Sequence, residues 1–132
     1  IAEFISNYGV NIEKNLHQLW RRIIFNIAIS NTDDHLRNHG FIVHNNGWHL
    51  SPAYDINPSI YKNGLALNID MENNALDLEL AKSVGTFFQL NTQKMNSIIK
   101  EVQLAVSSWR KIANQIGIPR NEQEKMAKAF FV

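Results

Sequence analysis

Apolar residues recur at intervals of three and four along two long stretches, which is the spacing of one face of an α-helix. The earlier stretch begins after Asn11, a residue type that caps helices, and runs to about Ser30. The later stretch begins at Thr92, which we expect to be its cap, and ends at Gly117. Its apolar positions are Met95, Ile98, Ile99, Val102, Ala105, Val106, Trp109, Ile112, Ala113 and Ile116. Because such faces need a core to cover them, the sequence predicts a mostly helical domain.

A short β-hairpin is predicted between the two helices. Residues 40–44 form a run of β-branched and aromatic side chains, and residues 48–50 form a second run. The sequence Asn45-Asn46-Gly47 separates them, and Asn-Gly between two such runs is a strong hairpin signal. The next stretch lies between two prolines, Pro52 and Pro58, so we expect it to be an extended loop.

The remaining predicted elements are shorter. Residues 65–69 alternate weakly between apolar and polar side chains, which indicates a further short strand. Asn74 or Asp77 can cap a short helix that follows it. Asn121, with Glu124 three residues later, resembles a capping box for a last helix.

The length of 132 residues suits one compact domain and is too short for two ordinary ones. Hydrophobic residues make up 45% of the chain, which is enough to bury a core. We therefore expect residues 1–132 to form a single domain, mainly α with a small β-hairpin (α+β). The sequence does not start with Met, so we expect it to be a fragment of a longer protein.

Charge and composition exclude several functions. A formal net charge of +1 lacks the basic footprint of a dedicated nucleic-acid binder. Without cysteine, the chain has no disulfide, no thiolate zinc site and no thiol nucleophile. No apolar run approaches the roughly 18 residues of a membrane span, and the first residues do not resemble a signal peptide. We expect a cytoplasmic protein with no membrane contact.

Polar residues gather between Asn31 and Asp55. The predicted hairpin folds the chain back on itself, so Asn38 before it and Asp55 after it are expected to lie side by side. Asp33 and Asn38 are five residues apart, as in the protein-kinase catalytic loop, where the Asp accepts the substrate hydroxyl proton and the Asn binds Mg²⁺. Asp55 completes such a set, because Mg²⁺ prefers oxygen ligands.

Each of these residues also has an ordinary structural interpretation. Asp33 and Asp34 follow a long helix and can serve as turn and cap residues, and on spacing alone this is the better interpretation. Asn38 can be a turn residue ahead of the hairpin, and Asp55 can form an Asx turn.

Four of the five histidines lie between residues 35 and 49. His35 and His39 have the spacing of zinc ligands on a helix, but Gly40 and the hairpin follow at once, so a structural zinc site is not favoured. His44 and His49 flank the predicted turn, and we expect them to be cross-strand neighbours on the surface.

A metal-dependent nuclease of the ββα type is an alternative function. Asp34 and His35 precede the hairpin, and Asn57 could supply a ligand from a following helix. Pro58 and Gly64 interrupt that helix, and the near-neutral charge gives little attraction for phosphates.

Two separated motifs carry a family resemblance. Asn-x-Asp-x-His-x-x-Asn stands at residues 31–38, and Pro-x-Tyr-Asp stands at residues 52–55. In this order they strongly resemble the C-terminal domain of HipA-type serine/threonine kinases, the toxin halves of bacterial toxin–antitoxin pairs. The resemblance runs from about Leu16 to near the C-terminus, and it implies a protein-kinase-like C-terminal helical lobe.

The resemblance implies a role for each motif residue. Asp33 corresponds to the catalytic base, and Asn38 and Asp55 correspond to Mg²⁺ ligands. Asn31 and His35 are motif residues, and His35 is expected to orient the loop rather than to transfer protons. The resemblance gives no role to the neighbouring Asp34.

The implied reaction transfers the γ-phosphoryl group of ATP, with Mg²⁺, to a Ser or Thr of a protein, in studied relatives an aminoacyl-tRNA synthetase. The implied partner is a HipB-like DNA-binding antitoxin, with no direct nucleic-acid contact by this chain. The family's Gly-rich phosphate loop and Val-Ala-x-Lys strand lie N-terminal to this domain and are absent here. We therefore expect a truncated lobe with half of a nucleotide site and with weak or no turnover on its own. A catalytically dead kinase-like binding module is the other alternative.

Overall fold

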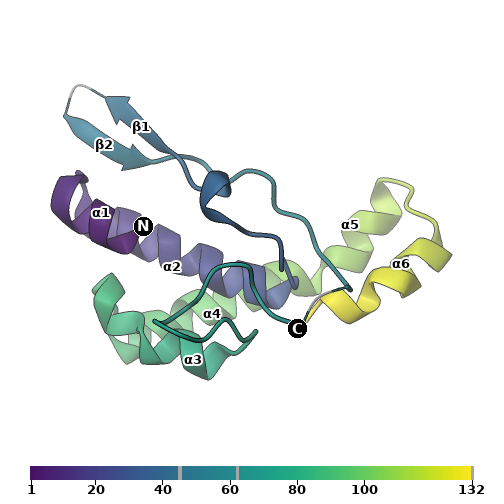
Figure 1. The fold of residues 1–132 in the computed structure, drawn as a ribbon. Helices are drawn as coiled ribbons and strands as arrows, with labels where there is room; N and C mark the ends of the chain where they lie inside the picture. The colour runs from purple at the N-terminus through teal and green to yellow at the C-terminus, as the bar shows by residue number, and fades with distance from the viewer. Residues whose placement is uncertain (45, 62, 132) are drawn as a thin grey trace.

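The computed structural model describes residues 1–44, 46–61 and 63–131. The chain is mostly helical, with one two-stranded antiparallel hairpin, so the predicted α+β class is confirmed (Figure 1). In chain order, with η for a 3₁₀ helix, the elements are α1 (Ala2–Tyr8), α2 (Ile12–Ala28), η1 (Leu36–Asn38), β1 (Phe41–His44), β2 (Gly47–Leu50), α3 (Leu78–Ser83), η2 (Gly85–Phe88), α4 (Thr92–Ser107), α5 (Trp109–Gln115), α6 (Arg120–Met126) and η3 (Ala127–Ala129).

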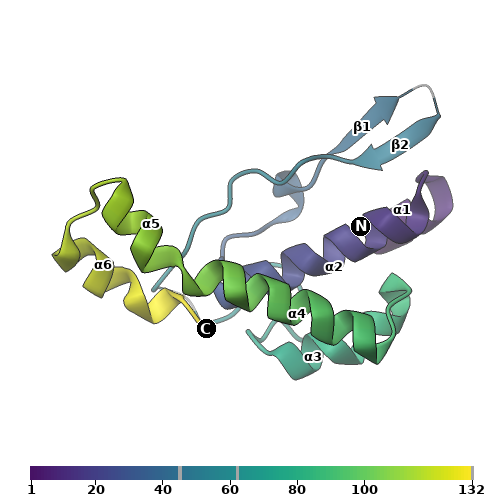
Figure 2. The same ribbon diagram turned by 180° about the vertical axis from the view of Figure 1, so that it is seen from behind.

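Helix α2 lies at the centre of the molecule. It contacts α1, α3, η2 and α4, and Figure 2 shows α4 lying along it from the other side. The apolar stripe of α2 is buried, and the Trp20 side chain is fully enclosed. The indole Nε1 of Trp20 donates a hydrogen bond of 2.9 Å to the carbonyl oxygen of Ala81 on α3. The core therefore forms around α2, as the helical periodicity predicts.

The hairpin covers α1 at one end of the molecule, and α5 and α6 lie at the other end (Figure 1). Phe41 pairs with Leu50, which fixes the register of the two strands. The Phe4 ring of α1 lies 4.5 Å from that of Phe41 and 5.9 Å from that of Trp48, measured between ring centroids. The predicted hairpin is confirmed; Asn45 of its predicted turn lies outside the described residues.

The rings of His44 and His49 lie edge to face with centroids 5.2 Å apart. Their predicted cross-strand proximity is therefore confirmed. Among the described residues, no helix is long and apolar enough to cross a membrane.

The helix predicted from Thr92 onward is two helices. Its cap is Asn91, whose side chain accepts a hydrogen bond of 2.8 Å from the Lys94 N–H, so Thr92 is the first helical residue. Helix α4 ends at Ser107, and α5 starts at Trp109. At the break, the Ser108 hydroxyl donates to the Ala105 carbonyl, a local bond that competes with the helical ladder.

Trp109, the first residue of α5, stacks on the Phe130 ring, with centroids 4.2 Å apart and planes 7° from parallel. The change of direction after α4 therefore places this ring against the C-terminal segment. Sequence periodicity missed the break because the apolar spacing continues through it.

The predicted strand at residues 65–69 is wrong. Residues 65–69 form no strand, and the residue before them, Gly64, makes an isolated bridge with Ala75. Leu65 is buried, and its carbonyl oxygen accepts a hydrogen bond of 2.6 Å from the Asn74 side chain. Asn74 bonds both backbone groups of Leu65, and the Asn73 carbonyl accepts from the Ile69 N–H, so the two ends of this segment are paired without a strand.

Two predicted caps have different outcomes. Asp77 caps α3, since its carboxylate accepts a hydrogen bond of 2.8 Å from the Glu79 N–H. The capping box at Asn121 is wrong, because Pro119 precedes the first residue of α6 and Asn121 lies inside the helix. Pro119 itself stands at the cap position, with an extended backbone at ψ 145°.

Replacing Trp20 by Ala should lower the free energy of unfolding by about 3–5 kcal/mol, because the change leaves a core cavity and removes the bond to Ala81. Equilibrium urea unfolding followed by circular dichroism measures this. The matched control is Trp48→Ala on the hairpin, where the side chain is 41% exposed and the expected loss is about 1 kcal/mol. Equal losses in the two variants would contradict the central place of Trp20.

Candidate active site

The first motif follows the C-terminal end of α2. Ser30 takes a left-handed conformation with φ 51°, which turns the chain out of the helix. Asn31 and Thr32 are then buried, each with 1% of its surface exposed, and the Asn31 N–H donates to the Asn26 carbonyl at 2.8 Å. Residues 31–39, here called the site loop, are therefore anchored at their start in the core, whereas the next residue, Asp33, is exposed.

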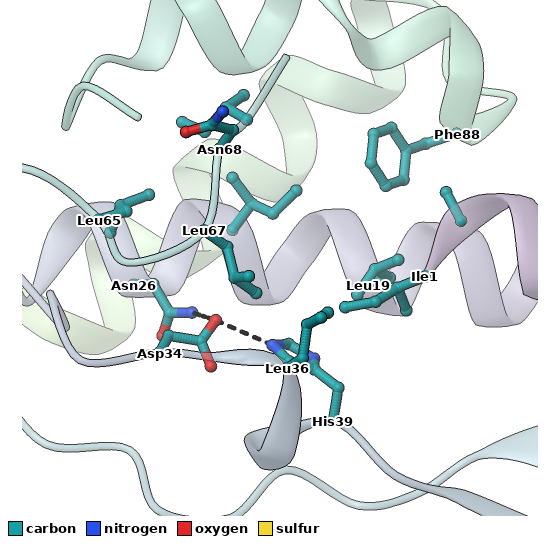
Figure 3. A pocket seen from close by; sticks show the side chains of 13 residues that line it. Ile1, Leu19, Asn26, Asp34, Leu36, His39, Leu65, Leu67, Asn68 and Phe88 are labelled. Atoms are coloured by element: carbon teal, nitrogen blue, oxygen red, sulfur yellow. Dashed lines mark hydrogen bonds and ion pairs between the residues drawn. The ribbon is translucent and has the colours of Figure 1, made fainter. Parts of the chain in front are cut away.

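Side-chain hydrogen bonds connect the two ends of the site loop. The Asn31 amide donates to the Asn26 side-chain oxygen at 3.0 Å, and the Asn26 amide donates to Asp34 Oδ2 at 2.6 Å. The same Oδ2 atom is 2.9 Å from Nε2 of His39 (Figure 3). Asp34 thus links α2 to both ends of the site loop.

Asn38 lies in the turn of η1 and is buried. Its backbone N–H donates to the His35 carbonyl at 2.8 Å, and its side-chain Nδ2 donates to the Asp33 carbonyl at 3.4 Å. The amide oxygen is the atom that would bind a cation, because it carries the lone pairs and the amide nitrogen only donates. His35 holds this turn through its carbonyl, and within the described part of the chain its buried Nδ1 has no hydrogen-bond partner.

The chain returns to the site loop after the hairpin. Residues 51–55, here called the return segment, run beside η1 (Figure 1). The Ser51 N–H donates to the Gly40 carbonyl at 2.9 Å, and the Tyr54 hydroxyl donates to the Arg37 carbonyl at 2.7 Å. A Cβ on Gly40 would lie 3.2 Å from Ser51 Oγ, so glycine permits this close approach.

These bonds bring together the two segments that carry Asn38 and Asp55, since Tyr54 and Arg37 are their direct neighbours in sequence. Asp55 is exposed and has a left-handed conformation with φ 53°. Its Oδ1 accepts a hydrogen bond of 2.9 Å from the side-chain amide of Asn57, whereas an Asx turn would use the backbone N–H of Asn57 as donor, so this bond does not form one. The second carboxylate oxygen of Asp55 can accept from other groups.

Arg22 of α2 anchors the start of the return segment. The arginine is buried, and its Nη2 donates to the Ser51 carbonyl. Burial lowers the pKa of the Arg22 guanidinium, and the negative charge of Asp34 acts in the opposite direction. Arg22 therefore places positive charge between α2 and both segments of the site.

The side chains of Asn38 and Asp55 supply donor atoms of the type that Mg²⁺ prefers. Among residues 1–44, 46–61 and 63–131, no three His, Cys, Asp or Glu side chains are grouped to hold a metal by themselves. The amide oxygen of Asn38 and the carboxylate of Asp55 are hard oxygen donors. Mg²⁺ usually takes one or two carboxylates and completes its octahedron with water and substrate phosphates.

The nuclease arrangement is not formed. A ββα site needs a helix directly after the hairpin, and no helix occurs between β2 and α3 in the described part of this stretch. Asn57, its candidate ligand, lies in a loop and donates to Asp55.

Sequence analysis missed Asn26, Asp34, His39 and Arg22 as parts of the site. Periodicity assigns Asn26 and Arg22 only to a helix face, and the motif gives Asp34 no role. A polar side chain within a buried helical stripe, as at Asn26 and Arg22, is the signal that could have identified them.

The family comparison matches residues 1–110 to the HipA-like C-terminal domain. The match includes both motifs and confirms the resemblance, although it begins before Leu16 and ends at Arg110 rather than near the C-terminus. Among curated proteins, none matches the sequence.

Replacing Tyr54 by Phe should loosen the return segment, because the change removes only the hydroxyl that donates to Arg37. The lost bond corresponds to about 0.5–1.5 kcal/mol. Hydrogen exchange should accelerate at the Asn38 amide, while Tyr61→Phe, a matched change at a residue that is 89% exposed, should leave it unaltered. Unchanged exchange in the Tyr54 variant would show that this contact does not hold the two segments together.

Proposed function

Because the chain belongs to the HipA-like C-terminal domain family, we propose that it is the C-terminal lobe of a serine/threonine protein kinase. The complete protein transfers the γ-phosphoryl group of ATP to a Ser or Thr hydroxyl of a protein. The observation that carries this proposal is the docking of the return segment on the site loop, through the bonds Tyr54–Arg37 and Ser51–Gly40.

Asp33 is the proposed catalytic base. It is exposed and directly follows Asn31 and Thr32, which are buried and hold the start of the loop. A carboxylate at this position accepts the proton of the substrate hydroxyl as the hydroxyl oxygen bonds to the γ-phosphorus and the bond to ADP breaks.

Asn38 and Asp55 are the proposed Mg²⁺ ligands. When bound, the ion neutralises charge on the phosphates of ATP. Asn38 offers its amide oxygen, while its amide nitrogen donates to the backbone carbonyl of Asp33. Asp55 offers a carboxylate from the return segment, and Asn57 orients that carboxylate through Oδ1. His35 and Asn31 hold the loop in place rather than touch the substrate.

The remaining parts of the proposal follow from family membership. The chain lacks the Gly-rich loop and the lysine strand that hold ATP phosphates, so this lobe alone is inactive. The complete protein is a cytoplasmic toxin, with a translation-linked protein substrate such as an aminoacyl-tRNA synthetase and a HipB-like DNA-binding antitoxin as its partner.

In the complete protein, Asp33→Asn should abolish phosphoryl transfer while the protein still folds, because the amide cannot accept the hydroxyl proton. Transfer of radioactive phosphate from ATP measures this, and circular dichroism checks the fold. The matched control is Asp77→Asn, which alters a helix cap on α3 and should keep activity. Retained transfer in the Asp33 variant would remove Asp33 from the mechanism.

A Mn²⁺ titration of the complete protein, followed by paramagnetic broadening of its NMR signals, tests the ligands. The broadening should be strongest at the signals of Asn38 and Asp55. Addition of ATP should confine it more closely to the residues around them. Asp55→Asn should weaken it, since a carboxylate binds the cation more strongly than an amide. Broadening centred on His35 and His39 and indifferent to ATP would instead support the nuclease.

A further inference from the structure

The carboxylate of Asp34 is the centre of the hydrogen-bond network behind the site loop. Its Oδ2 atom lies 2.6 Å from the Asn26 amide nitrogen and 2.9 Å from Nε2 of His39. The pair is buried, with side-chain exposures of 14% for Asp34 and 5% for His39. Because a carboxylate oxygen only accepts hydrogen bonds, Nε2 of His39 carries the hydrogen.

The pair joins the two sides of a short turn. Asp34 precedes η1 and His39 follows it, so their bond closes the stretch that contains His35 and Asn38. Asn26 ties the same carboxylate to α2, which is rigidly packed in the core. These two bonds to one oxygen atom add to the bonds that Asn38 makes directly to the carbonyls of Asp33 and His35, and together they hold Asn38 relative to Asp33.

The surroundings strengthen these bonds. Asp34, His39 and Asn26 form a polar end of a cavity of about 260 Å³ whose other walls are largely apolar, including Leu19 and Leu36 (Figure 3). Hydrogen bonds in such surroundings are stronger than in water, and leaving a partner unpaired there is costly. The charge of Asp34 also acts on the buried Arg22, which anchors the return segment.

We propose that Asp34 and His39 are positioning residues that set the geometry of the catalytic loop and so determine its affinity for Mg²⁺. The inference rests on the proposed kinase function and assigns two residues to which the motif gives no role. Asp34 and His39 act through Asn38 and Asp33 and touch neither the substrate nor the metal.

The test uses the complete protein and measures the Mg²⁺ concentration that gives half the maximal rate of phosphoryl transfer. His39→Leu removes the donor to Asp34 and should raise that concentration about tenfold or more, the usual effect of removing a partner that orients metal ligands. His39→Gln should restore the wild-type value, because its amide nitrogen reaches about as far as Nε2. Asp34→Asn keeps an oxygen that can accept both bonds but removes the negative charge that strengthens them, so it should shift the concentration in the same direction as His39→Leu. Asp77→Asn is the control for charge loss at a remote cap.

A purely structural role would lower the melting temperature and leave the Mg²⁺ dependence unchanged in the folded protein, and that result would overturn the inference. Equal effects of His39→Gln and His39→Leu would also overturn it.

Mn²⁺ broadening at Asn38 gives the second readout and needs no activity: His39→Leu should weaken it and His39→Gln should not. If Asp33→Asn loses phosphoryl transfer but the Asp34 and His39 variants keep the wild-type Mg²⁺ dependence, the positioning role is refuted and the proposed kinase function stands. Absence of phosphoryl transfer by the unmodified complete protein would refute the kinase function itself.

Discussion

Helix α2 is covered by α1, α3, η2 and α4, and this burial positions every part of the site. Trp20 holds α3 through its bond to Ala81, and residues on other faces of α2 hold the functional segments. Arg22 bonds the start of the return segment, and Asn26 bonds both the backbone of Asn31 and the carboxylate of Asp34. The core and the site therefore share one rigid element, which suits a site that needs fixed geometry.

The exposed residues of the site depend on buried ones. Asp33 and Asp55 are exposed, but each follows residues that are bonded to the rest of the chain: Asn31 on one side and Tyr54 on the other. Each anchoring bond contributes only about 1 kcal/mol net, so the arrangement relies on several bonds acting together. This organisation allows exposed carboxylates to face a substrate while their backbone stays fixed.

Patterns within the sequence predicted the elements that short-range physics controls. The α2 stripe, the hairpin and the cap at Asp77 depend on residues close in sequence, and all three were confirmed. The break at Ser108 was missed because the apolar spacing continues across it, and the strand at residues 65–69 was wrong because Asn74 satisfies that backbone instead. Helix α1, seven residues without a side-chain cap, has too weak a local signal to be predicted.

For the site, the sequence by itself determined the motif residues, their order and the hairpin that returns Asp55 towards Asn38. Only the tertiary structure decided what the neighbours Asp33 and Asp34 do. The left-handed turn at Ser30 and the burial of Asn31 and Thr32 leave Asp33 exposed and place Asp34 against Asn26 and His39. Spacing cannot distinguish two adjacent carboxylates, because the direction of each side chain depends on backbone angles and on partners elsewhere in the fold.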